Sequence, residues 1–285
     1  MCISEFIINH EIIIRLGFFF GILLAMALWE LALPRRVSMV SKLLRWINNV
    51  GIVFLNSLLL HIIFPMAAAG VAMFAHGHEW GLFNYFKVTY WVAAVLSVVV
   101  MDFAIYLQHV MFHAVPVFWR IHRMHHADLD FDVTTGIRFH PIEIVLSMLI
   151  KFAIIIVLGP PIVSVIVFEV LLNATSMFNH GNVWIPHKID RILRWFAVTP
   201  DMHRVHHSVE AYETNTNFGF SMPWWDRLLG TYRDQPQMGH EGMTIGLQGF
   251  RDTKSCTMLP GMLAIPFIGK INDYTINRRK WSQNQ

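Results

Sequence analysis

The stretch Ile142–Leu172, "IEIVLSMLIKFAIIIVLGPPIVSVIVFEVLL", decides the fold that we predict for this chain. A helix needs about 20 apolar residues to cross a membrane, so this run is too long for a single pass. Gly159, Pro160 and Pro161 interrupt its middle, and proline stops a helix because it has no amide hydrogen to donate. We therefore predict two short antiparallel helices that enter the membrane and return as a hairpin.

The rest of the chain also has the composition of a membrane protein. Of its 285 residues, 55% are hydrophobic and only 14% are charged, and the mean hydropathy is +0.46. Three further apolar runs are long enough to span, at residues 12–33, 51–75 and 90–107. We predict one domain over residues 1–285, an all-α integral membrane helical bundle of about three spans plus the hairpin, with a cytoplasmic helical cap from Phe178 onward.

The distribution of lysine and arginine predicts the orientation of this bundle. The loop after the first apolar run carries Arg35, Arg36, Lys42 and Arg45, whereas the loop after the second run carries Lys87 alone. Short loops rich in these cations stay on the cytoplasmic side, so we expect the N-terminus outside and the cap inside. No basic block is interleaved with aromatic residues, so a nucleic-acid partner is not expected.

Histidine is the residue type that indicates function. The strings HVMFH, HRMHH and HRVHH place imidazoles three and four residues apart, on one face of a helix. Their members are His109, His113, His122, His125, His126, His203, His206 and His207. Two copies of His-x-x-His-His would arise by chance in only about one such sequence in a thousand. Neutral imidazole binds iron, copper, nickel and zinc, and eight of them exceed the ligands of one ion, so we predict a di-metal site.

Polar residues near the strings are candidates for holding the ligands in place. A carboxylate in a membrane helix is costly and is a functional candidate by default, and it could accept a hydrogen bond from a ligating imidazole. The candidates at helical spacing from a histidine, or directly before the last string, are Asp102, Tyr106, Glu169, Asn173 and Asp201. Asp128, Asp130 and Asp132 follow the second string, and an exposed loop explains them at least as well.

Six strings in a fixed order make the chain resemble a known family: QHVMFH, HRMHH, RFHPIE, FNHGNV, PDMHRVHHS and WWDRLLGTY. Over about residues 95–235 it is similar to the sterol desaturase/fatty acid hydroxylase superfamily of membrane di-iron oxygenases. The resemblance implies two iron ions, O2 as co-substrate, and hydroxylation or desaturation of a C–H bond of a sterol, a fatty acyl chain or a related lipid. Other branches are ether-lipid monooxygenases, such as those of alkylglycerols, and carotenoid hydroxylases.

The resemblance also implies a ligand set. It matches the eight histidines of the three strings and adds His180 in NHGN and His140 in HPIE. For His140 the alternative is a hydrogen-bonded helix start before Pro141. The substrate and the oligomeric state stay open, because nothing in these strings distinguishes one lipid or one assembly from another.

Other classes of protein give different expectations. A membrane haem protein and a metal-binding or transport protein are the non-enzyme alternatives, whereas a zinc protease is not expected because no HExxH string exists. The chain also lacks a GxGxxG string and the HPGG string of cytochrome b5 type domains. We therefore expect a separate electron donor, a ferredoxin, a cytochrome b5 or a reductase, and place its docking site at Lys188, Arg191 and Arg194.

Overall fold

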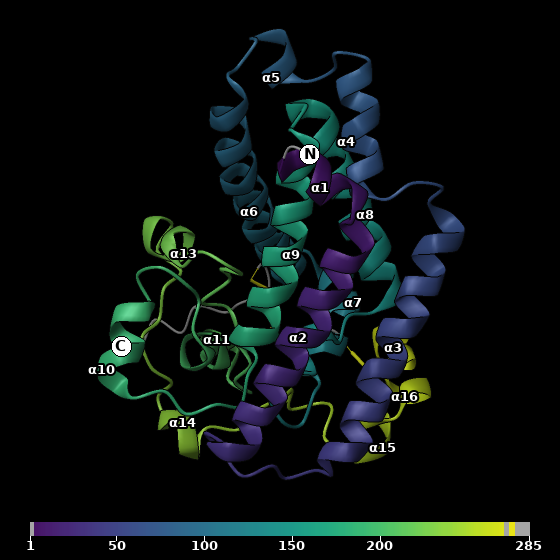
Figure 1. The fold of residues 1–285 in the computed structure, drawn as a ribbon. Coiled ribbons are helices and arrows are strands. Elements are labelled where there is room, and N and C mark those ends of the chain that lie inside the picture. The colour runs from purple at the N-terminus through teal and green to yellow at the C-terminus, as the bar shows by residue number, and fades with distance from the viewer. Residues whose placement is uncertain (1–2, 271–273, 277–285) are drawn as a thin grey trace.

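The computed structural model describes residues 3–270 and 274–276, and in these residues the secondary structure is helical, with isolated β-bridges and no strand (Figure 1). The predicted all-α fold is confirmed. The long helices are α2 (Glu11–Ala32), α3 (Lys42–Ile63), α6 (Tyr90–Ala114), α8 (Pro141–Leu158) and α9 (Ile162–Asn179). The shorter elements among them are α1 (Ile3–Asn9), α4 (Ala68–Gly77), α5 (Leu82–Tyr85), α7 (Pro116–His126) and the 3-10 turn η1 (Thr135–Ile137).

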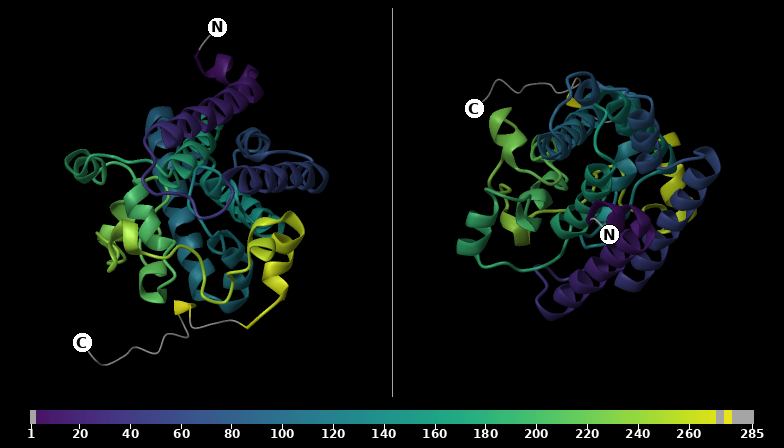
Figure 2. Two further views of the ribbon diagram at one scale, coloured as in Figure 1. Left: turned by 90° about the horizontal axis from the view of Figure 1, so that it is seen from below. Right: turned by 45° about the horizontal axis from the view of Figure 1, so that its top comes forward.

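The C-terminal part of the chain forms the cap. Its elements are α10 (His187–Leu193), α11 (Pro200–His206), α12 (Ala211–Thr214), α13 (Trp224–Leu228), α14 (Gly239–Gly242), α15 (Thr253–Thr257), α16 (Leu259–Ala264) and η2 (Ile265–Phe267). Seen from below, these green and yellow elements spread across the lower end of the long helices (Figure 2). The basic loop between α2 and α3 lies at this same end (Figure 1).

The hairpin predicted from the opening stretch is present as α8 and α9. Gly159 ends α8 in the left-handed conformation, with φ of 64°, which glycine adopts without steric cost. A side chain there would collide with the carbonyl of Trp80. Pro160 and Pro161 follow, so α9 begins only at Ile162 and runs back toward the cap.

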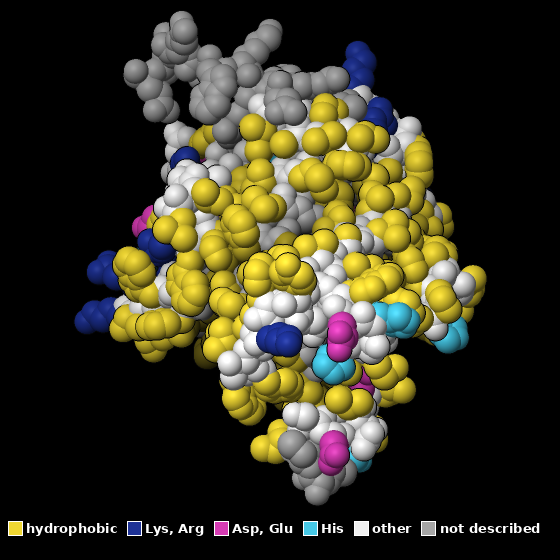
Figure 3. All heavy atoms as spheres, turned by 90° about the horizontal axis from the view of Figure 1, so that it is seen from above, with side chains coloured by type: hydrophobic (Ala, Val, Ile, Leu, Met, Phe, Trp, Pro, Cys, Tyr) yellow, Lys and Arg dark blue, Asp and Glu magenta, His cyan; other side chains and the backbone are white. Residues whose placement is uncertain are grey.

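Five helical segments are long and apolar enough to cross a membrane in the part of the chain that the structure describes. Large apolar side chains such as Ile12, Leu31 and Phe54 remain mostly exposed on them, as expected for surfaces that face lipid. The end that carries α5 is also mostly hydrophobic, with few charged side chains (Figure 3). The chain is therefore a multi-pass membrane protein.

The second of these segments differs from the prediction of one span at residues 51–75. Its helical structure begins nine residues earlier, with Lys42, and breaks between Ile63 and Ala68. Pro65 causes the break, because a residue before proline is held out of the helical conformation and Phe64 has an extended backbone. α4 then continues as a separate short helix.

α9 lies at the centre of the bundle, where α2, α4 and α6 all pack against it (Figure 1). The core between these helices contains Ala72, Met101, Ile105 and Phe168, all buried. Because α9 is central and ends directly beneath this core, its last turn and the residue after it face the cap.

The exposed-loop interpretation of the three aspartates after α7 is wrong. Asp128 and Asp132 are buried and form ion pairs with Arg45 of α3, at 2.8 and 2.5 Å. Asp130 accepts hydrogen bonds from the backbone amides of Met39 and Val40. The loop between α7 and α8 is thus fastened to the start of α3, because buried carboxylates need such partners.

Candidate metal centre

Nine buried histidines form two adjoining groups where the bundle meets the cap. Within each group, one ligand atom per residue lies within 4.8 Å of every other. The first group is His109, His113, His122, His126 and His206, and the second group is His125, His180, His203 and His207. The rings of His126 and His207 stack with 4.5 Å between their centroids, so the two groups are in direct contact.

Three helices and one helix end present these imidazoles. α6 carries His109 and His113 one turn apart, whereas α7 and α11 each carry an HxxHH string at or beside the C-terminal end of the helix. Each of these two helices begins with proline, whose fixed φ suits the first helical position. His180 follows the last residue of α9. The hairpin therefore returns the chain to the place where α7 left it.

Six of the nine imidazoles have Nδ1 next to an oxygen that can only accept a hydrogen bond. The Nδ1 atoms of His109, His125, His180 and His206 lie 2.8–3.1 Å from the backbone carbonyls of Phe218, Arg138, Ser176 and Thr216. His122 Nδ1 lies 2.7 Å from a Glu143 carboxylate oxygen and His113 Nδ1 lies 3.1 Å from Asn215 Oδ1. Nδ1 therefore carries the proton, and Nε2 keeps the lone pair that a metal ion needs.

The Nε2 atoms of the first group converge. His113 and His122 place theirs 3.1 and 3.2 Å from Nε2 of His126. Nε2 of His109 and of His206 is buried and has no hydrogen-bond partner among the described residues. A buried nitrogen without a partner is costly, and the four imidazoles of this group whose Nδ1 is fixed as the donor turn their Nε2 lone pairs into one place, so this arrangement fits a cation.

The second group has the same character. Nε2 of His125 and of His203 each lies 3.2 Å from Nε2 of His180. Burial lowers the pKa of His180 to about 3, and burial with neighbouring imidazoles lowers the pKa of His125, His203 and His207 well below the ordinary value. The imidazoles therefore stay neutral, and the two groups fit two metal ions of the kind that nitrogen ligands prefer.

His140 lies outside both groups. Its Nδ1 accepts a hydrogen bond from the Ile142 amide at 3.2 Å, at the first turn of α8, and its Nε2 lies 3.3 Å from the carbonyl of Leu263. This is the helix start that the sequence offered as the alternative to a ligand role.

The structure does not bring the polar candidates of α6 to the imidazoles. Asp102 accepts a hydrogen bond from Nε1 of Trp225 at 2.8 Å, so this tryptophan is tied to the bundle. The Tyr106 hydroxyl lies 2.9 Å from the Thr231 hydroxyl. Both residues join α6 to the cap.

The other three candidates also have partners outside the two groups. Glu169 pairs with Lys151 at 2.5 Å and with Arg15, and Asn173 donates to the backbone carbonyl of Glu169 at 2.9 Å. Asp201 pairs with Arg204 beside it on α11. Glu169 and Asn173 nevertheless line a cavity that reaches the first group.

Sequence reasoning missed the residues that do hold the imidazoles. Glu143 accepts the hydrogen bond of His122, although it stood in the string RFHPIE and could have been singled out. Asn215 lies 102 residues from His113, and the other four acceptors are backbone carbonyls. A carbonyl carries no side-chain signal in a sequence, so only the fold could identify these partners.

We expect Glu143→Gln to weaken metal binding by about 10- to 100-fold, because outer-shell partners of metal ligands have effects of this size. The amide preserves the shape of the side chain but is a weaker acceptor for Nδ1 of His122. Competition with a chelator would measure the affinity. Glu79→Gln, at an exposed position far from the cap, is the matched control, and equal affinities of the two variants would contradict a role of Glu143 at the site.

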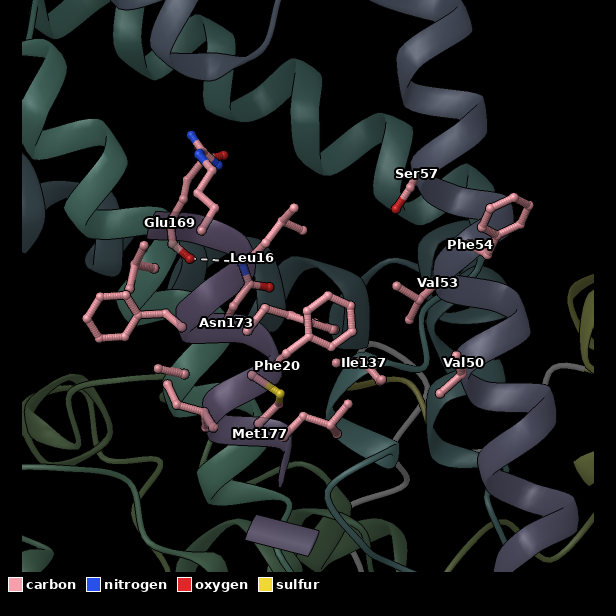
Figure 4. Close-up of a pocket in the computed structure, with 17 residues that line it drawn as sticks. Leu16, Phe20, Val50, Val53, Phe54, Ser57, Ile137, Glu169, Asn173 and Met177 are labelled. Carbon is pink, nitrogen blue, oxygen red and sulfur yellow. Dashed lines mark hydrogen bonds and ion pairs between the residues drawn. The ribbon is translucent and has the colours of Figure 1, made fainter. Parts of the chain in front are cut away.

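Two overlapping cavities connect the first group with the lipid-facing surface. The inner cavity, of about 430 Å³, is lined by His109 and His122 at one end and by Lys151 and Glu169 at the other, a size typical of small-molecule sites. The outer cavity, of about 370 Å³, lies between α2, α3 and α9. In Figure 4, Glu169, Asn173 and Met177 follow one another down α9, opposite Val53 and Ser57 of α3.

The predicted docking patch for an electron donor is not a row of free cations. Arg194 is buried and pairs with Asp190 at 2.6 Å and with Asp234 at 2.9 Å. Lys188 and Arg191 are exposed on α10, and Arg191 contacts His187 at 3.2 Å. The patch therefore reduces to two exposed cations.

Comparison with known proteins places this centre in a family. Residues 94–231, which contain all nine clustered histidines, match the fatty acid hydroxylase family. Ornithine lipid hydroxylase OlsE of Rhizobium tropici is 32% identical over 178 residues, which cover 61% of this chain and 51% of the relative. This matched region places residues 94–231 in the fatty acid hydroxylase/sterol desaturase superfamily. The resemblance found in the sequence is thereby confirmed.

Other members of the superfamily show how far the similarity extends. Alkylglycerol monooxygenase of Xenopus tropicalis is 25% identical over 211 residues, covering 71% of this chain and 45% of that enzyme. Fatty acid hydroxylase vlmA of a Lecanicillium species is 28% identical over 159 residues, covering 51% of this chain and 43% of that protein. The chain thus spans about half the length of the curated relatives it matches. No solved structure matches it.

Proposed function

We propose that this protein inserts one oxygen atom from O2 into a C–H bond of a membrane lipid, at two iron ions held by the nine clustered histidines. The observation that carries the proposal is the convergence of buried Nε2 lone pairs beside a cavity that opens between membrane helices. The names of the relatives support the same class, because they are lipid hydroxylases and monooxygenases.

The chemistry divides between the metal ions and the protein. Iron, when bound, would supply the activation of O2 that no amino-acid side chain provides. The other oxygen atom leaves as water, so each turnover consumes two electrons and two protons. The protein holds six of the imidazoles in one tautomer through Nδ1, and the walls of the cavity position the lipid and exclude bulk water.

The electrons must reach the centre from the side of the cap. We propose that this side faces the cytoplasm, because the basic loop with Arg35 and Arg36 lies there, and that a separate ferredoxin, cytochrome b5 or reductase docks on it. Lys188 and Arg191 offer exposed positive charge for such a partner.

Purified protein loaded with iron should convert a membrane lipid when O2 and a reductant are supplied. With isotopically labelled O2, the product should gain the mass of one labelled oxygen atom, which mass spectrometry detects. Loss of two hydrogen atoms without a gain of oxygen would indicate desaturation instead. Exchangeable metal with no lipid-dependent O2 consumption would identify a metal-binding or transport protein, and a haem absorption band would also contradict the proposal.

A further inference from the structure

The inner cavity has hydrogen-bond acceptors without partners at its end next to the histidines. Asn56 Oδ1, Gln108 Oε1 and Glu143 Oε2 are buried atoms with no hydrogen-bond partner among the described residues. All three residues line this cavity together with His109 and His122. They come from α3, α6 and α8, so three separate helices contribute oxygen atoms to one place. A buried acceptor without a donor costs about 1–3 kcal/mol, which a ligand with donors would offset.

The neighbours of these residues support this orientation of the side chains. Asn56 Nδ2 donates to the backbone carbonyl of Phe139 at 2.9 Å, and a carbonyl can only accept, so Oδ1 must be the atom left without a partner. Gln108 Nε2 donates to the Ser147 hydroxyl at 2.7 Å. Both Asn56 and Glu143 are nearly fully buried. The free atoms of Asn56 and Glu143 are therefore acceptors, and Gln108 Oε1 is the third in this structure.

The far end of the cavity is different, because its charges are already paired. Lys151 and Arg15 both contact the Glu169 carboxylate, and Arg15 also pairs with Glu11 at 2.8 Å. These two cations and two carboxylates balance one another. One buried atom there, Nε of Arg15, lacks a partner in the described part of the chain. Lys151 lies eight residues after Glu143 on α8, about 12 Å away at 1.5 Å per residue.

We propose that the acceptor-lined end binds a hydrogen-bond-donating head of the lipid, a hydroxyl or an ammonium group, beside His109 and His122. This inference rests on the proposed function and names its substrate class: a lipid with an uncharged or cationic head, oxidised at a C–H bond near that head. Carboxylate and phosphate heads are disfavoured, because they bring further acceptors toward the oxygen atoms of Asn56, Gln108 and Glu143.

The outer cavity offers the hydrocarbon chain a way out. The paired charges of Arg15, Lys151 and Glu169 close the far end to an apolar chain. The outer cavity opens sideways between α2 and α3, where Phe20 and Phe54 are largely exposed and line the opening. The chain of a bound lipid lies in this gap and continues into the bilayer.

Binding of three lipids with the same hexadecyl chain length tests this assignment: the glycerol ether, the amine and palmitate. Each is bound to the metal-loaded full-length protein in lipid nanodiscs without O2, and its dissociation constant is measured with a radiolabel. We expect the glycerol ether or the amine to bind more tightly than palmitate. The tighter of the two identifies the donor as a hydroxyl or as an ammonium group.

Gln108→Met and Asn56→Leu should each weaken binding of the preferred lipid by about 2- to 10-fold, the effect of one lost hydrogen bond, and leave palmitate unchanged. Gln108→Met keeps the size of the side chain and is informative even if Asn56→Leu fails to fold. Gln108→Glu keeps an acceptor and should keep the binding. Asn84→Leu, in α5 at the other end of the protein, should not change the binding of any of the three lipids.

Palmitate that binds as tightly as the other lipids, and loses affinity in Lys151→Met, would overturn the inference, because the head would then lie at the far end. The experiment is separate from turnover. A head-group preference without any oxygenated product would leave this site standing and contradict the proposed function, whereas product formation without the preference would contradict only the site.

Discussion

On the proposed two-metal site, His180→Ala should retain about one metal ion instead of two, and its turnover should fall by more than about 100-fold. His180 Nε2 lies 3.2 Å from Nε2 of both His125 and His203, so its loss leaves the second group with three imidazoles. Even partners one shell further out change metal affinity or activity by 10- to 100-fold. Elemental analysis of the purified protein and a turnover assay measure the two quantities.

A comparison between the groups sharpens this prediction. His206→Ala leaves four imidazoles in the first group, enough for a four-coordinate site, so it should keep more metal than His180→Ala. His78→Ala is the control, because His78 is exposed near the opposite end of the bundle. If His180→Ala kept both ions and full turnover, the assignment of the second group as a metal site would be wrong.

The convergence of the histidines and the presence of the hairpin could both be predicted from the sequence, for different physical reasons. HxxHH imposes a common face on any helix, so the convergence of His122, His125 and His126 follows from local geometry. Gly159 and the two prolines after it leave few conformations other than a turn. The hairpin returns the chain to the membrane face from which it entered. The last HxxHH string therefore comes to lie beside the first.

The sequence was insufficient where partners are distant or lack a side chain. Nothing local connects Asp128 with Arg45, which lies 83 residues earlier, and a polar run after a helix resembles an exposed loop. Asp102 was placed beside an imidazole because of its spacing on α6, yet Trp225 from the cap occupies that position. A spacing rule gives the direction of a side chain but not the residue that meets it.

Arg45→Met should destabilise the protein by about 3–5 kcal/mol, the usual consequence of removing one partner from a buried ion pair. Arg45 is fully buried and contacts Asp128, Asp132 and Thr135 at 2.5–3.0 Å, so its loss leaves Asp132 without its cation and Asp128 with only Arg138, at 3.9 Å. The thermal unfolding midpoint in detergent should fall clearly, and the second group should bind metal less tightly. Arg138, whose carbonyl holds His125, belongs to the same loop.

A double variant distinguishes the loss of the ion pair from the loss of packing volume at Arg45. Asp128→Asn combined with Arg45→Met removes the carboxylate together with its arginine, so the double variant should lose less stability than the sum of the two single variants, by a coupling energy of about 0.5–3 kcal/mol. Arg45→Lys keeps the charge but loses the two-pronged contact with Asp128, and its stability should be intermediate. Strictly additive effects would show that the arginine acts through its volume. The carboxylates would then be stable without it, and the loop that positions His125 would have to be fastened to α3 by other contacts.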